Sequence, residues 1–152
     1  MSYPRVKEYF EGLGLESLIT VHETPCDTVT HAAENIGCEE AQIAKTMSFL
    51  LDDEPIVIVC TGDVKIANPK YKATFHKKAK MIPFDMVTEI TGHEPGGVCP
   101  FALKEGVKVY LDESLRRFED VHAAGGRPDV TVHITVEKLE ELCRAQWVDV
   151  CG

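Results

Sequence analysis

The sequence predicts an α+β fold in which one domain, residues 1–152, holds a mixed, curved β-sheet flanked by helices. The chain has the size of one domain, and it contains no repeat and no linker rich in Pro, Gly or Ser. Residues 56–60 (Ile-Val-Ile-Val-Cys) form an almost continuous β-branched run, which is expected when both faces of a strand are covered. Strand-like and helix-like segments are mixed without strict alternation, and this pattern favours α+β.

Helical signals occur in several segments. Val6, Tyr9, Phe10 and Leu13 recur at spacings of three and four, which predicts an amphipathic helix over residues 4–15. Thr30 is expected to cap a helix that Gly37 ends. Further helices are predicted at residues 68–79, 83–92 and 136–144, with a helical turn at 112–118.

Strands are predicted between these helices. Residues 42–51 and 56–60 flank a polar Asp-Asp-Glu-Pro turn, so they are expected to form an antiparallel hairpin at the centre of the sheet. The other predicted strands are residues 18–22, 107–112, 130–135 and 147–150.

Composition excludes several classes of protein. Hydrophobic residues make up 44% and charged residues 27%, as in an ordinary globular protein. No apolar run approaches the roughly 20 residues of a membrane span, and the N-terminal segment lacks the apolar core of a signal peptide. We therefore expect a cytoplasmic protein with no membrane contact. The six cysteines form no C-x-x-C pair, so free thiols and no metal site are expected.

Charge is distributed unevenly along the chain. The net charge is −9, yet residues 64–84 contain no acid. Two interpretations remain open, a basic face for RNA or a solvated lysine-rich helix. The lysines concerned are Lys65, Lys70, Lys72, Lys77, Lys78 and Lys80.

Lys45 stands near the start of a strand that otherwise looks buried. An unpaired buried ammonium is costly, so such a lysine faces a cleft or an anion, or else extends to solvent.

Residues 91–101 form a segment rich in Gly and Pro. Gly96 and Gly97 can turn backbone N–H groups toward a ligand as an anion nest or oxyanion hole, although a plain connecting turn is the alternative. His93 and Cys99 raise a second alternative, a thiol nucleophile with its base. A small-residue segment at 123–129 leaves room for a substrate or is simply a β-turn.

These segments, taken in order, resemble the YbaK/EbsC family, relatives of the editing domain of bacterial prolyl-tRNA synthetases. The resemblance covers about residues 20–136. The matching stretches are Thr30-His31-Ala32-Ala33, Gln42-Ile43-Ala44-Lys45-Thr46, Val59-Cys60-Thr61-Gly62-Asp63, Thr91-Gly92, Gly96-Gly97-Val98-Cys99-Pro100-Phe101, Val109-Tyr110-Leu111-Asp112 with Ser114-Leu115, and Ala124-Gly125-Gly126.

The resemblance implies hydrolysis of the ester that joins an amino acid to the terminal ribose of tRNA. Lys45 would hold the terminal phosphate or ribose, and the loop of Gly96, Gly97 and Pro100 would offer N–H groups to the ester carbonyl. Water or a substrate side chain would attack, without a cofactor. The remaining matching positions implied to contact the substrate are Thr30, Thr46, Val98, Cys99, Phe101, Asp112, Ala124 and Gly125.

The resemblance leaves the substrate open. Many family members have a serine where this chain has Ala124, and the Asn and His-Pro pattern of the alanine-specific branch is missing near His122. Cys-tRNA(Pro) is the first expectation and Ala-tRNA(Pro) the second. The expected partners are the acceptor end of tRNA and prolyl-tRNA synthetase, with the chain a monomer or homodimer. The alternative is a noncatalytic module that binds aminoacyl-tRNA or a synthetase.

Overall fold

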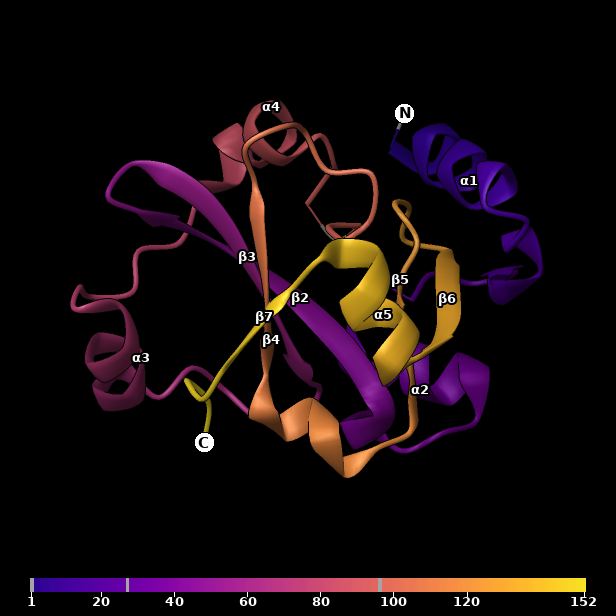
Figure 1. Cartoon of the computed structure of the whole chain (residues 1–152). Coiled ribbons are helices and arrows are strands. Elements are labelled where there is room, and N and C mark those ends of the chain that lie inside the picture. The colour runs from indigo at the N-terminus through magenta and orange to yellow at the C-terminus, as the bar shows by residue number, and fades with distance from the viewer. Residues whose placement is uncertain (1, 27, 96) are drawn as a thin grey trace.

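The computed structural model describes residues 2–26, 28–95 and 97–152, and these form a seven-stranded sheet with helices packed around it (Figure 1). The strand order is β1-β6-β5-β2-β3-β4-β7. The strands are β1 (Ile19–Val21), β2 (Ile43–Leu51), β3 (Glu54–Thr61), β4 (Lys108–Asp112), β5 (Asp120–Ala124), β6 (Val130–Thr135) and β7 (Gln146–Val148). The α-helices are α1 (Ser2–Gly12), α2 (Val29–Ile36), α3 (Asn68–Phe75), α4 (Val87–Thr91) and α5 (Val136–Cys143). Short 3-10 turns lie at Glu16–Leu18, Glu40–Gln42, Phe84–Met86 and Glu113–Arg117.

The sheet is mixed, as predicted. β2 and β3 pair antiparallel, as do β5 with β6 and β1 with β6. β2 runs parallel to β5, β3 to β4, and β4 to β7. The α+β class is therefore confirmed.

The hairpin of β2 and β3 lies at the centre of the sheet. Ile56 is 1% exposed and the next four residues are fully buried, which confirms that both faces of this strand are covered. Asp52 and Asp53 make the turn with φ of 51° and 67°. Aspartate tolerates this left-handed backbone better than most residues, so the predicted turn has a local cause.

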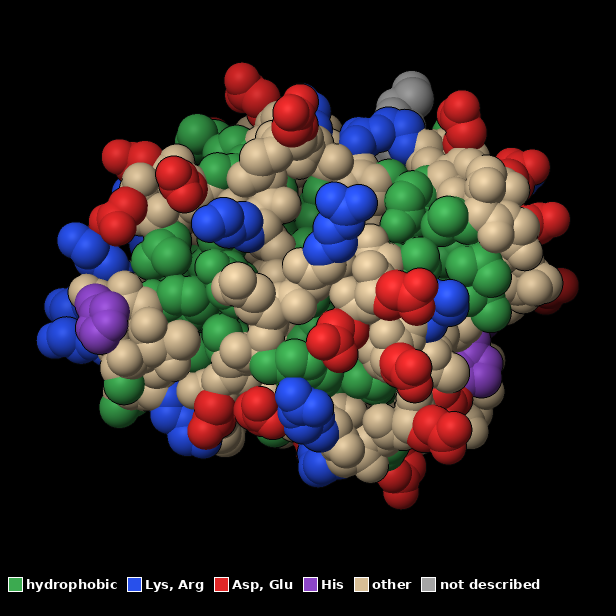
Figure 2. Space-filling model, in the orientation of Figure 1, with side chains coloured by type: hydrophobic (Ala, Val, Ile, Leu, Met, Phe, Trp, Pro, Cys, Tyr) green, Lys and Arg blue, Asp and Glu red, His purple; other side chains and the backbone are tan. Residues whose placement is uncertain are grey.

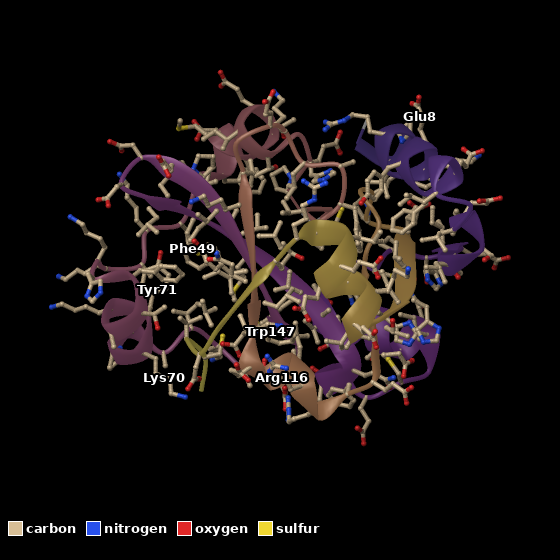
Figure 3. The ribbon with its side chains drawn as sticks, viewed as in Figure 1. Glu8, Phe49, Lys70, Tyr71, Arg116 and Trp147 are labelled. Atoms are coloured by element: carbon tan, nitrogen blue, oxygen red, sulfur yellow. The ribbon has the colours of Figure 1, made fainter. Side chains whose placement is uncertain are left out.

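Hydrophobic cores cover both faces of the hairpin. On one face, Val6 and Phe10 of α1 and Leu139 of α5 belong to a core that includes Val57 and Val59. On the other face, α3 covers Phe49 with Tyr71, whose ring centroids are 5.6 Å apart (Figure 3). The hairpin is thus held from both sides.

Several predicted boundaries were wrong. Thr28, not Thr30, caps α2 by accepting a hydrogen bond from the His31 N–H, whereas Gly37 ends this helix in the left-handed conformation as expected. α3 ends at Phe75 because His76 adopts φ of 62°. The helix predicted over 83–92 has the expected bounds, since Pro83 precedes it and Gly92 ends it in the left-handed conformation, but it is a 3-10 turn followed by the short α4.

β5 was not predicted as a strand. It runs parallel to β2 at Ile43 and Ala44 only. Further along β2, the Leu50 N–H donates to the Lys80 carbonyl and the Ile82 N–H donates to the Ser48 carbonyl. The β2 edge therefore has one neighbour at its start and another at its end, and the sheet opens between them.

None of the described helices has the length and apolar character needed to cross a membrane.

Candidate active site

A cavity of about 490 Å³ lies where β2 separates from β5. This volume falls in the usual range of small-molecule sites. Its walls come from β2, β5, α2, the segment that follows α3, and the loop before β4. The lining residues are Cys26, Thr28, Val29, Ala32, Ile43, Ala44, Lys45, Thr46, Met47, Ser48, Met81, Ile82, Phe84, Val87, Pro95, Val98, His122, Ala123, Ala124 and Thr131.

Lys45 brings the positive charge into this cavity. Its side chain is half-buried, and its ammonium donates to the Val64 carbonyl. An ammonium has three donors, and in the described part of the chain the other two have no acceptor. Among the described residues, no carboxylate pairs with it. A half-buried cation without a counter-charge favours the binding of an anion or an electron-rich oxygen.

Thr46 follows directly and also lines the cavity. Its hydroxyl oxygen is buried and has no hydrogen-bond partner among the described residues. Buried hydroxyls nearly always have a partner, so an unpaired one at a cavity wall indicates a place for a polar ligand atom.

The glycine-rich loop packs against the turn after β5, which brings two of the predicted features together. A Cβ on Gly97 would lie 3.0 Å from the Gly126 carbonyl carbon and 3.1 Å from the Arg127 nitrogen. Gly97 is therefore required because two backbone segments meet there. Val98, the next residue, lines the cavity.

The donors of this loop differ from those expected. The Gly97 N–H already donates to the Glu94 carbonyl at 2.9 Å. Pro100 is buried and, as a proline, has no N–H to offer. Gly96 lies outside the described residues. Within the described part of the loop, Pro95 and Val98 line the cavity, and of these two residues only Val98 has a backbone N–H.

The opposite wall comes from β5 and β6. Ala124 lines the cavity with a small side chain. His122 and Thr131 line the same wall, and the Thr131 hydroxyl lies 2.7 Å from the His22 Nε2.

The cavity brings together Lys45, Thr46, Val98 and Ala124, but the other predicted contacts lie elsewhere. Thr30 is exposed on α2 and bonds Glu40 at 3.4 Å. Asp112 is 1% exposed, and its carboxylate accepts hydrogen bonds from the Ser114 and Val150 N–H groups. Gly125, Cys99 and Phe101 are buried and do not line the cavity.

Cys99 and His93 do contact each other, with 3.5 Å between the sulfur and Nε2. Both are fully buried. Burial raises the pKa of the Cys99 thiol to about 12 and lowers the pKa of His93. A nucleophilic cysteine needs a thiolate in an accessible, electropositive place. This pair is a neutral part of the core and argues against the thiol mechanism.

The predicted RNA-binding lysines are exposed, and two of the six are paired with carboxylates. Lys70 bonds Asp149 at 3.0 Å and Lys77 lies 3.3 Å from Asp52. Figure 2 shows positive side chains gathered beside α3, while acidic side chains cover the region of α1. Lys80 directly precedes Met81, which lines the cavity. The remaining exposed lysines are Lys65, Lys72 and Lys78.

Two apolar side chains at the cavity were missed by the sequence reasoning. Met81 is 61% exposed and Phe84 is 79% exposed, and both contribute to the lining. A large exposed aromatic side chain beside a cavity is a candidate surface for a planar ligand group. The local sequence gave no signal, because exposure of an apolar residue depends on the fold.

The chain belongs to the aminoacyl-tRNA editing domain family, which it matches over residues 23–142, and the YbaK-type resemblance is thereby confirmed. It is 43% identical to the uncharacterized protein YwhH of Bacillus subtilis (strain 168) over 99% of this chain and 98% of the relative.

It is also 31% identical to a proline–tRNA ligase of Streptococcus thermophilus (strain ATCC BAA-491 / LMD-9), over 84% of this chain but only 21% of the ligase. Among solved structures, one provisionally described as a trans-editing enzyme for prolyl-tRNA synthetase superposes with a TM-score of 0.89 at 28% identity, covering 99% of this chain and 97% of that one.

Proposed function

We propose that this chain is a trans-editing deacylase that hydrolyses the ester of mischarged aminoacyl-tRNA. The single observation that carries the proposal is the cavity lined by both Lys45 and Thr46: within the described residues, the Lys45 ammonium has no carboxylate partner and the Thr46 hydroxyl has no hydrogen-bond partner. Such a site suits the phosphate and ribose of an acceptor end. Family membership and the resemblance to a ligase segment support the same conclusion.

In the proposed reaction, a water oxygen attacks the ester carbonyl carbon, and the bond to the ribose oxygen breaks. The ribose oxygen takes up the proton that the attacking water loses and becomes a hydroxyl, and the free amino acid leaves. Lys45 holds the phosphate or ribose end. The Gly97 N–H is already used in a hydrogen bond to the Glu94 carbonyl. We therefore assign the stabilisation of the oxyanion to the backbone N–H of Val98, which lines the cavity. No cofactor takes part, and the whole of residues 1–152 acts as one editing domain.

The mouth of the cavity completes the substrate site. Phe84 and Met81 offer an apolar surface on which the terminal base of the acceptor end stacks. The small side chain of Ala124 and the apolar walls admit small amino acids, so Cys-tRNA(Pro) is the first proposed substrate and Ala-tRNA(Pro) the second. Prolyl-tRNA synthetase, in the cytoplasm, is the proposed partner.

The test is deacylation of a panel of tRNA(Pro) and tRNA(Ala) charged with Cys, Ala, Ser or Pro. We expect rapid clearance of one mischarged species by the wild type. Lys45→Ala should lower kcat/KM by about 100-fold or more, as the loss of a preorganised electrostatic contact does. Lys7→Ala, on the exposed side of α1, is the matched control and should keep full activity.

Circular dichroism and thermal melts check that both variants fold. If the folded wild type clears none of the species, the chain is a noncatalytic binding module instead of a deacylase. Binding of the same charged tRNAs, measured by fluorescence, then identifies its ligand.

A further inference from the structure

Two histidines and an aspartate share one face of β5 and β6. In this antiparallel pair, His122 lies directly opposite His133, and Asp120 lies two residues before His122 on the same face. One ligand atom from each of the three side chains lies within 4.8 Å of the others. The donor set is two imidazoles and a carboxylate, which is the set found in zinc sites with three protein ligands.

The backbone beneath these side chains is rigid. The alternate residues of both strands point to the opposite face and are anchored in the core, each no more than 2% exposed: Val121, Ala123, Val132 and Ile134. Because neighbouring strand residues are fixed, the Cβ atoms of the three donors are fixed as well. Preorganised strands of this kind hold a metal site more precisely than loops do.

The three side chains already interact. The His133 Nε2 contacts the Asp120 carboxylate. The His122 and His133 rings stack with their centroids 4.2 Å apart and their planes 18° apart.

We propose that Asp120, His122 and His133 bind one divalent transition-metal ion, with zinc the best match, at the rim of the cavity. Three protein ligands leave a coordination position for water. The expectation of no metal was based on cysteine spacing, and no cysteine belongs to this site. The site is independent of the deacylation chemistry proposed above, although His122 also lines the cavity.

The test is titration of the full-length protein with zinc by calorimetry, and with cobalt(II) by visible absorption. We expect one ion per chain. His133→Ala and His122→Ala should each weaken binding by about tenfold or more, because each removes a ligand. His76→Asn is the matched control, since His76 is exposed at the end of α3 and asparagine tolerates its positive φ. This control should bind like the wild type.

The His133 side chain is 54% exposed, so its loss leaves the core intact, and thermal melts verify this for every variant. Absence of binding by the wild type would overturn the proposal. So would equal binding by His133→Ala, or a thiolate-to-cobalt charge-transfer band, which places the ion on cysteines.

Discussion

Lys45 differs from the other lysines of this chain in what surrounds it. Lys70 and Lys77 have carboxylate partners on the surface, whereas the half-buried Lys45 ammonium meets the neutral carbonyl of Val64. A protein that needed only stability at this position would do better with an apolar residue, since β2 is the central strand. The position of this lysine therefore supports the proposed role of Lys45 in holding the substrate, and the neighbouring Thr46 supports the same proposal.

Thr46 allows stability and function to be separated by one substitution. Thr46→Val keeps the shape and removes a buried hydroxyl that has no hydrogen-bond partner in the described part of the chain. We expect the free energy of unfolding to rise by about 1 kcal/mol, because an unsatisfied polar group costs about 1–3 kcal/mol. We expect KM for the mischarged tRNA to rise, because the substrate loses a hydrogen bond.

Urea unfolding and deacylation kinetics measure the two effects. Thr20→Val, an exposed strand position, is the control and should change neither quantity. A stabilised Thr46→Val with unchanged KM would mean that the hydroxyl does not meet the substrate.

At the scale of elements, the glycine-rich loop depends on its contact with the turn after β5. Gly97→Ala would place a methyl group 3.0 Å from the Gly126 carbonyl carbon, a contact so tight that the backbone of the turn must move to accept it. We expect a loss of about 1–3 kcal/mol in the free energy of unfolding and a lower kcat, because Val98 shifts. Gly12→Ala in α1 has open space around its new Cβ and should be neutral or slightly stabilising. Full activity of Gly97→Ala would show that the loop position does not matter for turnover.

The ion pair of Asp63 with Arg117 joins the end of β3 to the turn after β4. Hydrogen bonds from the Arg117 guanidinium, and to a smaller extent from the Thr61 hydroxyl, lower the pKa of Asp63 to about 2. An unfolded aspartate has a pKa of about 3.9, so the stabilisation is fully present above that pH and is lost as the pH falls through about 2.

Asp63→Asn should therefore be less stable than wild type at about pH 6, and the difference should shrink toward about pH 2. Urea unfolding over this pH range measures it. Asp53→Asn makes the same charge change at an exposed turn and should show no such convergence. A difference that is constant with pH would contradict the assignment to the ion pair.

The limits of sequence reasoning are clearest for β2 and β5. The hairpin was predictable because its β-branched run and its turn lie next to each other in the chain. β5 was not, because Asp120, His122 and the small Ala123 and Ala124 carry a weak strand signal beside a glycine pair. The cavity depends on the contact of Ala44 with Ala123, which are far apart in the sequence. Local patterns could identify Lys45 and the loop, but they could not distinguish Val98 on the cavity wall from Cys99 behind it.

At the scale of the whole molecule, the charge distribution is polarised and the cavity lies near its positive part. The net charge is −9, while residues 64–84 carry lysines and no acid. Lys80 stands directly before Met81 of the cavity mouth, and Lys78 is exposed beside it. A local patch of this kind can hold an acceptor end although the rest of the surface repels nucleic acid.

The double variant Lys78→Gln with Lys80→Gln tests whether this patch contacts RNA. Each lysine on a phosphate contributes about 1 to the slope of log K against log salt, so we expect weaker tRNA(Pro) binding and a slope shallower by up to about 2. Lys7→Gln with Lys108→Gln makes the same change in net charge on α1 and β4, away from the patch. Fluorescence titrations of both doubles over a range of salt separate the two effects. If both double variants weaken tRNA(Pro) binding equally, the affinity depends on the net charge of the protein and not on this patch. If neither does, residues 64–84 are a solvated face, and the acceptor end is held by Lys45 and the apolar mouth alone.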